Sequence, residues 1–155
     1  MSEAEQDRSH AEIRDSVRKL CLEFPGDYWR ALDRESAYPT EFVRALTQAG
    51  YLAALIPEEY GGSGLPLSAA VAILEEIQRA GCNGAACHAQ MYIMGALLRH
   101  GSDAQKAQYL PGIASGELRL QAFGVTEPSS GSDTGSLKTF AVRDGARQAR
   151  KTFLK

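Results

Sequence analysis

The sequence predicts a mainly α-helical fold that ends in the first strands of a β-domain. Over most of the chain, apolar residues recur three and four positions apart, as on one face of a helix, and helix-start and helix-stop signals separate these stretches. From Glu117 onward the spacing changes to the alternation that is typical of a strand. We therefore expect an all-helical domain over residues 1–118 and the incomplete start of a β-domain over residues 119–155.

The bulk composition indicates an ordinary soluble protein. The chain has 155 residues, of which 44% are hydrophobic, and a net charge of −2, so a packed core is expected and binding to nucleic acid is not. No apolar run approaches the roughly 18 residues needed to span a bilayer. The acidic N-terminus lacks the apolar core of a signal peptide. We expect a cytoplasmic protein whose few cysteines are reduced.

Two helices are expected in the N-terminal third. Ser9 and Glu12 form a capping box, in which the serine accepts a hydrogen bond from the backbone and the glutamate returns one. Apolar residues within 13–24 then recur at helical spacing until a Pro-Gly pair ends the helix. Residues 40–50 repeat this pattern over a shorter stretch.

Two longer helices are expected at 67–80 and 85–100. The first is amphipathic, with its charged residues predicted to face solvent: Glu75, Glu76 and Arg79. The second is apolar on nearly all sides, which predicts a place at the centre of a bundle. The glycine-rich stretch 57–64 before them lacks the lysine of a phosphate-binding loop, so a flexible connector between helices is the better interpretation.

The last helix and the strands follow. Ser102 and Gln105 form a second capping box, opening a short helix that Pro111 is expected to end. Alternation predicts strands over 117–124 and 137–143, with a hairpin turn at the Asp-Gly pair that comes next.

Several candidate sites are weak. Cys82, Cys87 and His88 could suggest a metal or haem site, but the spacing is wrong for haem attachment and a zinc site would need a fourth ligand. We therefore expect no metal site. Met91 and Met94 could line an apolar ligand slot, although ordinary core packing is the more common role of such residues.

The stretch FGVTEPSSGSD at 123–133 combines several features that suit a polar ligand. A proline keeps the backbone extended, and Gly131 allows a ligand to approach the backbone closely. Thr126, Ser130 and Ser132 offer hydroxyl groups, and adjacent N–H groups can hold an anion. A plain turn between two strands is the alternative, and the residues alone do not decide between them.

The chain resembles the acyl-CoA dehydrogenase family of flavoproteins. TEPSSGSD at 126–133 is similar to the family's flavin-contacting signature, and IPEEYGG at 56–62 to a second signature between N-terminal helices. GSDAQK at 101–106, followed by YLP at 109–111 and SGE at 115–117, is similar to a third. The three occur in the family's order, and the resemblance covers nearly the whole chain but less than half of the family's protein.

The resemblance implies a fold, a cofactor and site residues. The fold is the family's N-terminal helical bundle followed by the first strands of a truncated β-barrel domain. The cofactor is FAD, lined by Phe123, Gly124, Val125, Thr126, Gly131 and Ser132. The substrate is an acyl-CoA thioester, expected to contact Ser132, Met91 and Met94.

The implied reaction is α,β-dehydrogenation of the thioester, an oxidoreductase activity of fatty acid metabolism. In the family a glutamate base removes the α-proton while a hydride passes to the flavin. That base belongs to a C-terminal helical domain that we do not find here, so we assign no catalytic residue and leave the electron acceptor open. The alternative is a non-catalytic remnant or helical interaction module, one that could associate with full-length relatives.

Overall fold

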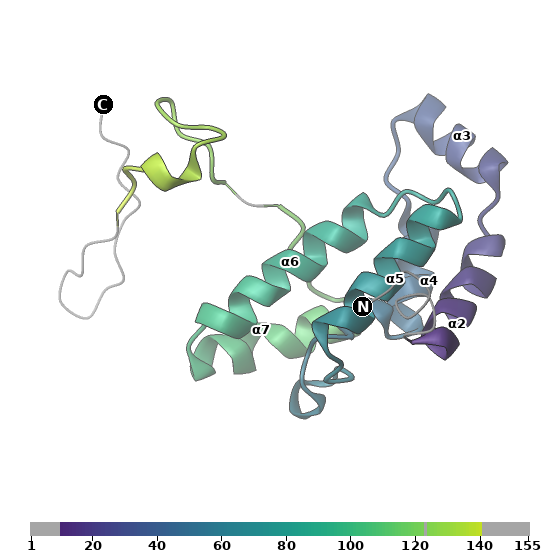
Figure 1. Cartoon of the computed structure of the whole chain (residues 1–155), viewed down its shortest axis with the longest axis horizontal. Coiled ribbons are helices and arrows are strands. Elements are labelled where there is room, and N and C mark those ends of the chain that lie inside the picture. The colour runs from purple at the N-terminus through teal and green to yellow at the C-terminus, as the bar shows by residue number, and fades with distance from the viewer. Residues whose placement is uncertain (1–9, 123, 141–155) are drawn as a thin grey trace, which may run out of the picture. The chain divides into compact units, whose positions relative to one another are not determined.

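The structure is a computed structural model that describes residues 10–122 and 124–140 (Figure 1). The chain divides into two compact units, Met1–Ala122 and Phe123–Lys155, and each is described here by itself. The first unit is helical and contains six α-helices in its described part: α2 Ala11–Leu22, α3 Gly26–Glu35, α4 Thr40–Gln48, α5 Leu67–Arg79, α6 Ala85–His100 and α7 Asp103–Ser115. Short 3₁₀ turns are η1 Tyr51–Ala53, η2 Glu58–Tyr60 and, in the second unit, η3 Thr134–Ser136.

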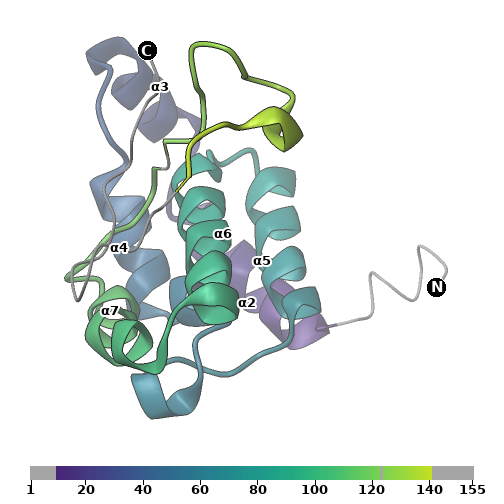
Figure 2. The ribbon, with the colours of Figure 1, turned by 90° about the vertical axis from the view of Figure 1, so that its left-hand side faces the viewer.

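The expected mainly helical fold is confirmed, and four helices have nearly the predicted bounds: α2, α4, α5 and α6. Helices α2 and α5 pack together, as do α5 and α6, which lie side by side in Figure 2. The core includes Val17 from α2, Phe42 from α4, and Ile73 and Ile77 from α5, each with none of its surface exposed. Burial of these periodic apolar residues is the main stabilising contribution to the bundle.

Helix α3 was not predicted from the sequence. It begins directly after Pro25, which we had taken only as the end of α2 but which also serves as the N-cap of α3. No residue of α3 is fully buried, so its apolar spacing gives little signal. The helix is attached by aromatic rings instead, because Trp29 lies edge-to-face on Phe42 with ring centroids 4.9 Å apart, and Tyr28 on Phe24 at 5.1 Å.

Helix α7 continues through Pro111, where we had expected it to end. The Ser102–Gln105 capping box is formed as predicted. Proline removes one backbone donor from a helix interior, but Leu110 and Ile113 on either side are fully buried and hold this turn in the core. The helix ends at Gly116, which has the left-handed conformation, φ 82°, that favours glycine.

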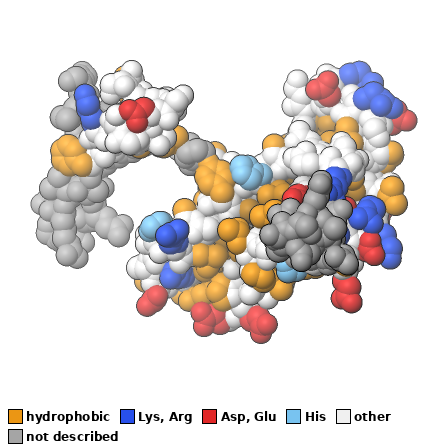
Figure 3. All heavy atoms as spheres, viewed as in Figure 1, with side chains coloured by type: hydrophobic (Ala, Val, Ile, Leu, Met, Phe, Trp, Pro, Cys, Tyr) orange, Lys and Arg blue, Asp and Glu red, His pale blue; other side chains and the backbone are white. Residues whose placement is uncertain are grey.

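Helix α6 does not lie at the centre of the bundle. Its buried residues are confined to one side, and they are Cys87, Gln90, Met91 and Met94. On the opposite side Tyr92 is 37% exposed and Ala96 is also exposed. Hydrophobic side chains accordingly reach the surface of the helical unit, as Figure 3 shows. The prediction was wrong because an apolar residue on a helix surface is common and does not require burial.

The expected strands are not seen in the described residues. The single β-feature there is an isolated antiparallel bridge between Glu127 and Ser130. A strand needs a neighbouring strand to satisfy its backbone N–H and C=O groups. Residues 117–122 are hydrogen-bonded to other parts of the helical unit instead. Leu118 donates its N–H to the carbonyl of Gly112 at 2.8 Å, and Tyr38 donates its hydroxyl to Gln121 at 2.8 Å. The end of the second predicted strand and the hairpin turn at Asp144 lie outside the described residues.

Candidate functional site

The predicted cofactor-binding stretch forms a loop over residues 124–140. Gly124, Thr126, Gly131 and Ser132 are exposed, and Val125 is half-buried. Phe123, which was also predicted to contact the cofactor, lies outside the described residues. The loop therefore presents most of the predicted contact residues at its surface.

Glu127 braces this loop from inside. Its backbone N–H donates to the carbonyl of Ser130 at 2.8 Å, and the N–H of Ser130 donates back at 3.2 Å. Its carboxylate accepts hydrogen bonds from the N–H of Lys138 at 2.9 Å and of Thr139 at 2.7 Å. Because hydrogen bonds to a charged acceptor are stronger than neutral ones, one side chain ties the two ends of the loop together.

The loop's hydroxyl groups have different roles. Ser130 is only 7% exposed, and its hydroxyl donates to the carbonyl of Asp133. Ser136 similarly donates to the carboxylate of Asp133. We had predicted that Ser130 offers its hydroxyl to a ligand, but this internal bond uses its proton, so Ser130 serves the loop's own structure.

Thr126 and Ser132 are among the loop hydroxyls that remain available. No other described residue is hydrogen-bonded to either side chain, and both residues are exposed. No described residue accepts from the backbone N–H of Gly131 or Ser132 either. Beside Gly131, no described residue other than its two chain neighbours has a heavy atom within 4 Å of the position that a Cβ would occupy. Outward donors beside open space are the arrangement that suits a ligand rich in hydrogen-bond acceptors.

Met91 and Met94 belong to the core of the helical unit. They are 5% and 1% exposed and are part of its main hydrophobic cluster. The neighbouring His88 and Tyr92 are among the exposed residues of this helix, with ring centroids 5.6 Å apart. Both methionines therefore have the core-packing role that the sequence left open. Their contact with a substrate stays a prediction.

A buried charge cluster on α2 and α5 was missed from the sequence, which placed Glu76 at the surface. Glu76 is only 1% exposed and accepts hydrogen bonds from Arg14 at 3.3 Å, Arg18 at 3.1 Å and Arg79 at 3.2 Å. Arg14 is also buried and forms a second ion pair with Glu75 at 2.7 Å. The cluster joins the two helices, which is a structural role.

The cysteines are buried thiols. Burial raises the pKa of Cys21 to about 12, with the nearby Cys82 adding to the effect, and burial likewise raises the pKa of Cys87 to about 12. Thiols with such pKa values stay protonated near neutral pH and are poor nucleophiles and poor metal ligands. In the described part of the chain, no three His, Cys, Asp or Glu side chains gather in a way that could hold a metal ion.

Comparison with known proteins identifies the family. Residues 7–117 match the family model of the acyl-CoA dehydrogenase N-terminal domain. The chain belongs to the acyl-CoA dehydrogenase family. The resemblance found in the sequence signatures is thereby confirmed for the N-terminal part of the family's protein.

Sequence comparison with individual acyl-CoA dehydrogenases agrees with this assignment. The chain is 40% identical to (2S)-methylsuccinyl-CoA dehydrogenase of Cereibacter sphaeroides over 137 residues, which are 86% of this chain and 24% of that protein. It is 36% identical to glutaryl-CoA dehydrogenase of Desulfococcus multivorans over 140 residues, 86% of this chain and 34% of that one. The chain thus spans well under half the length of these acyl-CoA dehydrogenases.

Solved structures show the same fold. The crystal structure of an acyl-CoA dehydrogenase from Geobacillus kaustophilus matches with a TM-score of 0.73 and 25% identity, covering 91% of this chain and 37% of that one. Butyryl-CoA dehydrogenase from Megasphaera elsdenii matches with a TM-score of 0.66 and 24% identity, over 85% of this chain and 37% of that one. Among the described residues, no helix has the length and apolar character required to cross a membrane.

Proposed function

We propose that this chain supplies one wall of the FAD and acyl-CoA site of an acyl-CoA dehydrogenase. The observation that carries the proposal is the loop at 124–140, where Thr126 and Ser132 direct unengaged hydroxyls outward from a frame braced by Glu127. The residues fit the cofactor, because the isoalloxazine edge and the pyrophosphate of FAD are rich in hydrogen-bond acceptors. FAD, when bound, supplies the acceptor for the hydride that leaves the substrate.

The roles proposed for the chain's own residues are binding and positioning. Thr126 donates to the polar edge of the flavin, and the N–H groups of Gly131 and Ser132 face the pyrophosphate. Ser132 also borders the thioester, and Phe123, Gly124 and Val125 complete the wall. Met91 and Met94 reach the acyl chain only if the core around them opens on that side. In this proposal the chain contributes no catalytic base.

A second candidate function is a helical module that acts without productive flavin binding. It is favoured by the core of the helical unit, to which α2 and the helices α4 to α7 contribute buried side chains and against which Tyr28 and Trp29 of α3 pack. Such a module would fold and could associate with full-length relatives, and the loop would then be a remnant of descent.

Flavin titration separates the two candidates. The full chain is titrated with FAD, and quenching of flavin fluorescence measures binding. We expect weak binding that Thr126→Val and Ser132→Ala each reduce several-fold, while the matched surface variant Ser63→Ala leaves it unchanged. We also expect no bleaching of the flavin by an acyl-CoA, because in this proposal the chain contributes no catalytic base. Absence of any FAD binding by a chain with helical circular dichroism would support the helical module instead.

A further inference from the structure

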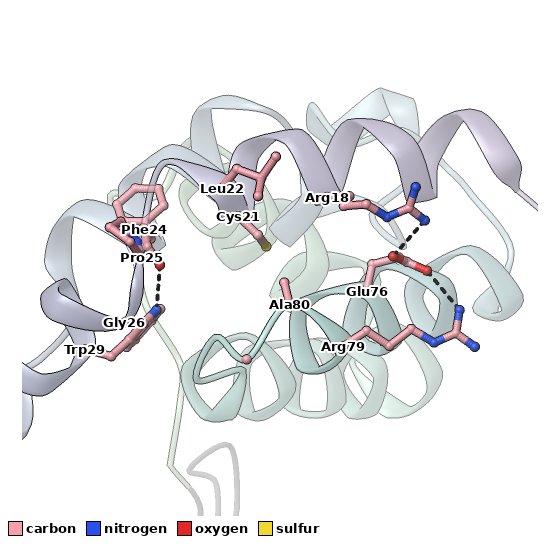
Figure 4. A pocket seen from close by; sticks show the side chains of 11 residues that line it. Arg18, Cys21, Leu22, Phe24, Pro25, Gly26, Trp29, Glu76, Arg79 and Ala80 are labelled. Carbon is pink, nitrogen blue, oxygen red and sulfur yellow. Dashed lines mark hydrogen bonds and ion pairs between the residues drawn. The ribbon is translucent and has the colours of Figure 1, made fainter.

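A hollow of about 510 Å³ lies where the end of α2, the start of α3 and the end of α5 meet (Figure 4). Its volume lies within the range of small-molecule binding pockets. All of its lining residues belong to the helical unit, and none belongs to the loop at 124–140. Neither the sequence signatures nor the proposed flavin site assigns it a role.

One end of the hollow is aromatic. Figure 4 shows Phe24, Pro25 and Trp29 together on one side of the opening. The indole N–H of Trp29 donates to the carbonyl of Phe24 at 3.0 Å, so the polar atom of the ring is already satisfied. Trp29 therefore offers its apolar surface to a ligand. Rings of this size contribute much of the binding energy in ligand and protein interfaces.

The other end carries guanidinium groups. Arg18 and Arg79 lie across the hollow from the aromatic residues, on either side of Glu76. The carboxylate of Glu76 is buried beneath them, while the side chains of Arg18 and Arg79 are 52% and 53% exposed. Asp15, 2.7 Å from Arg18, is a further acidic partner at this end. The charged residues that line the hollow are Arg18, Arg79 and Glu76, two cations and one anion, so the lining carries one net positive charge.

The floor between the two ends is made of small or apolar groups. Cys21 and Ala80 lie there, between the aromatic and the cationic side in Figure 4. A second hollow of about 410 Å³ shares Trp29 with the first, but its one charged lining residue is Asp33. The charges that line the first hollow therefore favour an anionic ligand, and the carboxylate of the second hollow disfavours one.

We propose that the hollow between α2, α3 and α5 binds a small amphipathic carboxylate, an aryl or short alkyl group that bears one carboxyl group. The apolar group lies against Phe24 and Trp29, and the carboxylate lies at Arg18 and Arg79, where a guanidinium can engage both of its oxygens. The proposal does not depend on flavin binding, since it uses no residue of the loop.

Trp29 gives a direct test because it is the chain's one tryptophan. The full chain is titrated with phenylbutyrate while the indole N–H resonance and the fluorescence of Trp29 are recorded, and phenylbutanol serves as the uncharged match. We expect saturable binding of the acid at millimolar or lower concentration, at least fivefold tighter than that of the alcohol. No saturable change at Trp29, or equal affinity for acid and alcohol, would overturn the proposal.

Two variants locate the site. Ala80→Phe fills the floor and should abolish binding. Arg79→Gln should weaken the binding of phenylbutyrate at least threefold and leave the binding of phenylbutanol unchanged. The control is Arg44→Gln, which removes another exposed arginine that is paired with a glutamate three residues away. This variant should bind phenylbutyrate as tightly as the unmodified chain does. Undiminished binding by Ala80→Phe would place the ligand elsewhere and refute the site. Circular dichroism verifies that each variant is folded.

Discussion

Arg14 Nη1 and Glu76 Oε1 lie 3.3 Å apart in the interior of the helical unit, where the side chains are 6% and 2% exposed. Removing one partner of a buried ion pair leaves the other charge without compensation, at a cost of about 3–5 kcal/mol. We therefore expect Glu76→Gln to lower the free energy of unfolding by about this amount, measured by urea denaturation. Glu41→Gln, which breaks an exposed pair with Arg44, should cost less than about 1 kcal/mol. Equal costs would show that burial is not what makes the Glu76 cluster important.

Gly62 and Gly95 should respond oppositely to alanine. A Cβ on Gly62 would lie 2.1 Å from the carbonyl oxygen of Ile56, whereas none of the compared atoms lies within 4 Å of a Cβ on Gly95 in α6. We expect Gly62→Ala to destabilise the chain by about 2–3 kcal/mol through this overlap. Gly95→Ala should stabilise it by up to about 1 kcal/mol, because alanine favours a helix interior. Thermal unfolding measures both, and a stable Gly62→Ala would contradict the tight packing of this turn.

Glu127 is expected to control the order of the loop without affecting the bundle. In Glu127→Ala, the N–H groups of Lys138 and Thr139 lose their acceptor, so their hydrogen exchange should accelerate at least about tenfold, the equivalent of 1.4 kcal/mol. The midpoint of urea unfolding should not change. Glu117→Ala, at an exposed position outside the loop, is the control. Unchanged exchange of both amides would show that the carboxylate does not brace the loop.

The thiol of Cys87 predicts loss of stability in alkali. Its pKa is raised from 9.0 to about 12 by burial, so the folded chain binds this proton more tightly than the unfolded chain does. The stabilisation is complete below about pH 9 and is lost as the pH rises from there toward 12, by at most about 1.4 kcal/mol per pH unit. Urea unfolding at pH 8 and pH 10.5 measures the slope, which should be shallower in Cys87→Ala. Equal slopes would contradict the assignment.

The helices could be predicted because their signals are local. The Ser102–Gln105 capping box and the apolar spacing of 67–80 each lie within one element, and the structure confirms both. The position of Glu76 could not be predicted in the same way. Its neighbour Glu75 has the same charge and also pairs with Arg14. Of the two, Glu76 is the buried one, and it binds both Arg14 and Arg18 of α2, a helix about 60 residues earlier.

In the loop, too, local features could be predicted from the sequence and longer-range contacts could not. The residue types at 123–133 predicted outward hydroxyls, and Thr126 and Ser132 are exposed. Ser130 looks equivalent in the sequence, but it is turned inward to Asp133. The brace formed by Glu127 was not foreseen, because its partners are backbone amides more than ten residues further on and carry no side-chain signal.

The pairing of α2 with α5 also has a consequence during synthesis. Arg14 leaves the ribosome 62 residues before the carboxylate that it needs. At about 5–20 residues per second, the interval is roughly 3–12 s. During that time the apolar face of α2 lacks the α5 residues that cover it in the folded chain, so this surface stays exposed on the nascent chain. The contact between α2 and α5 can form only after α5, the fourth α-helix of the described part, has been made.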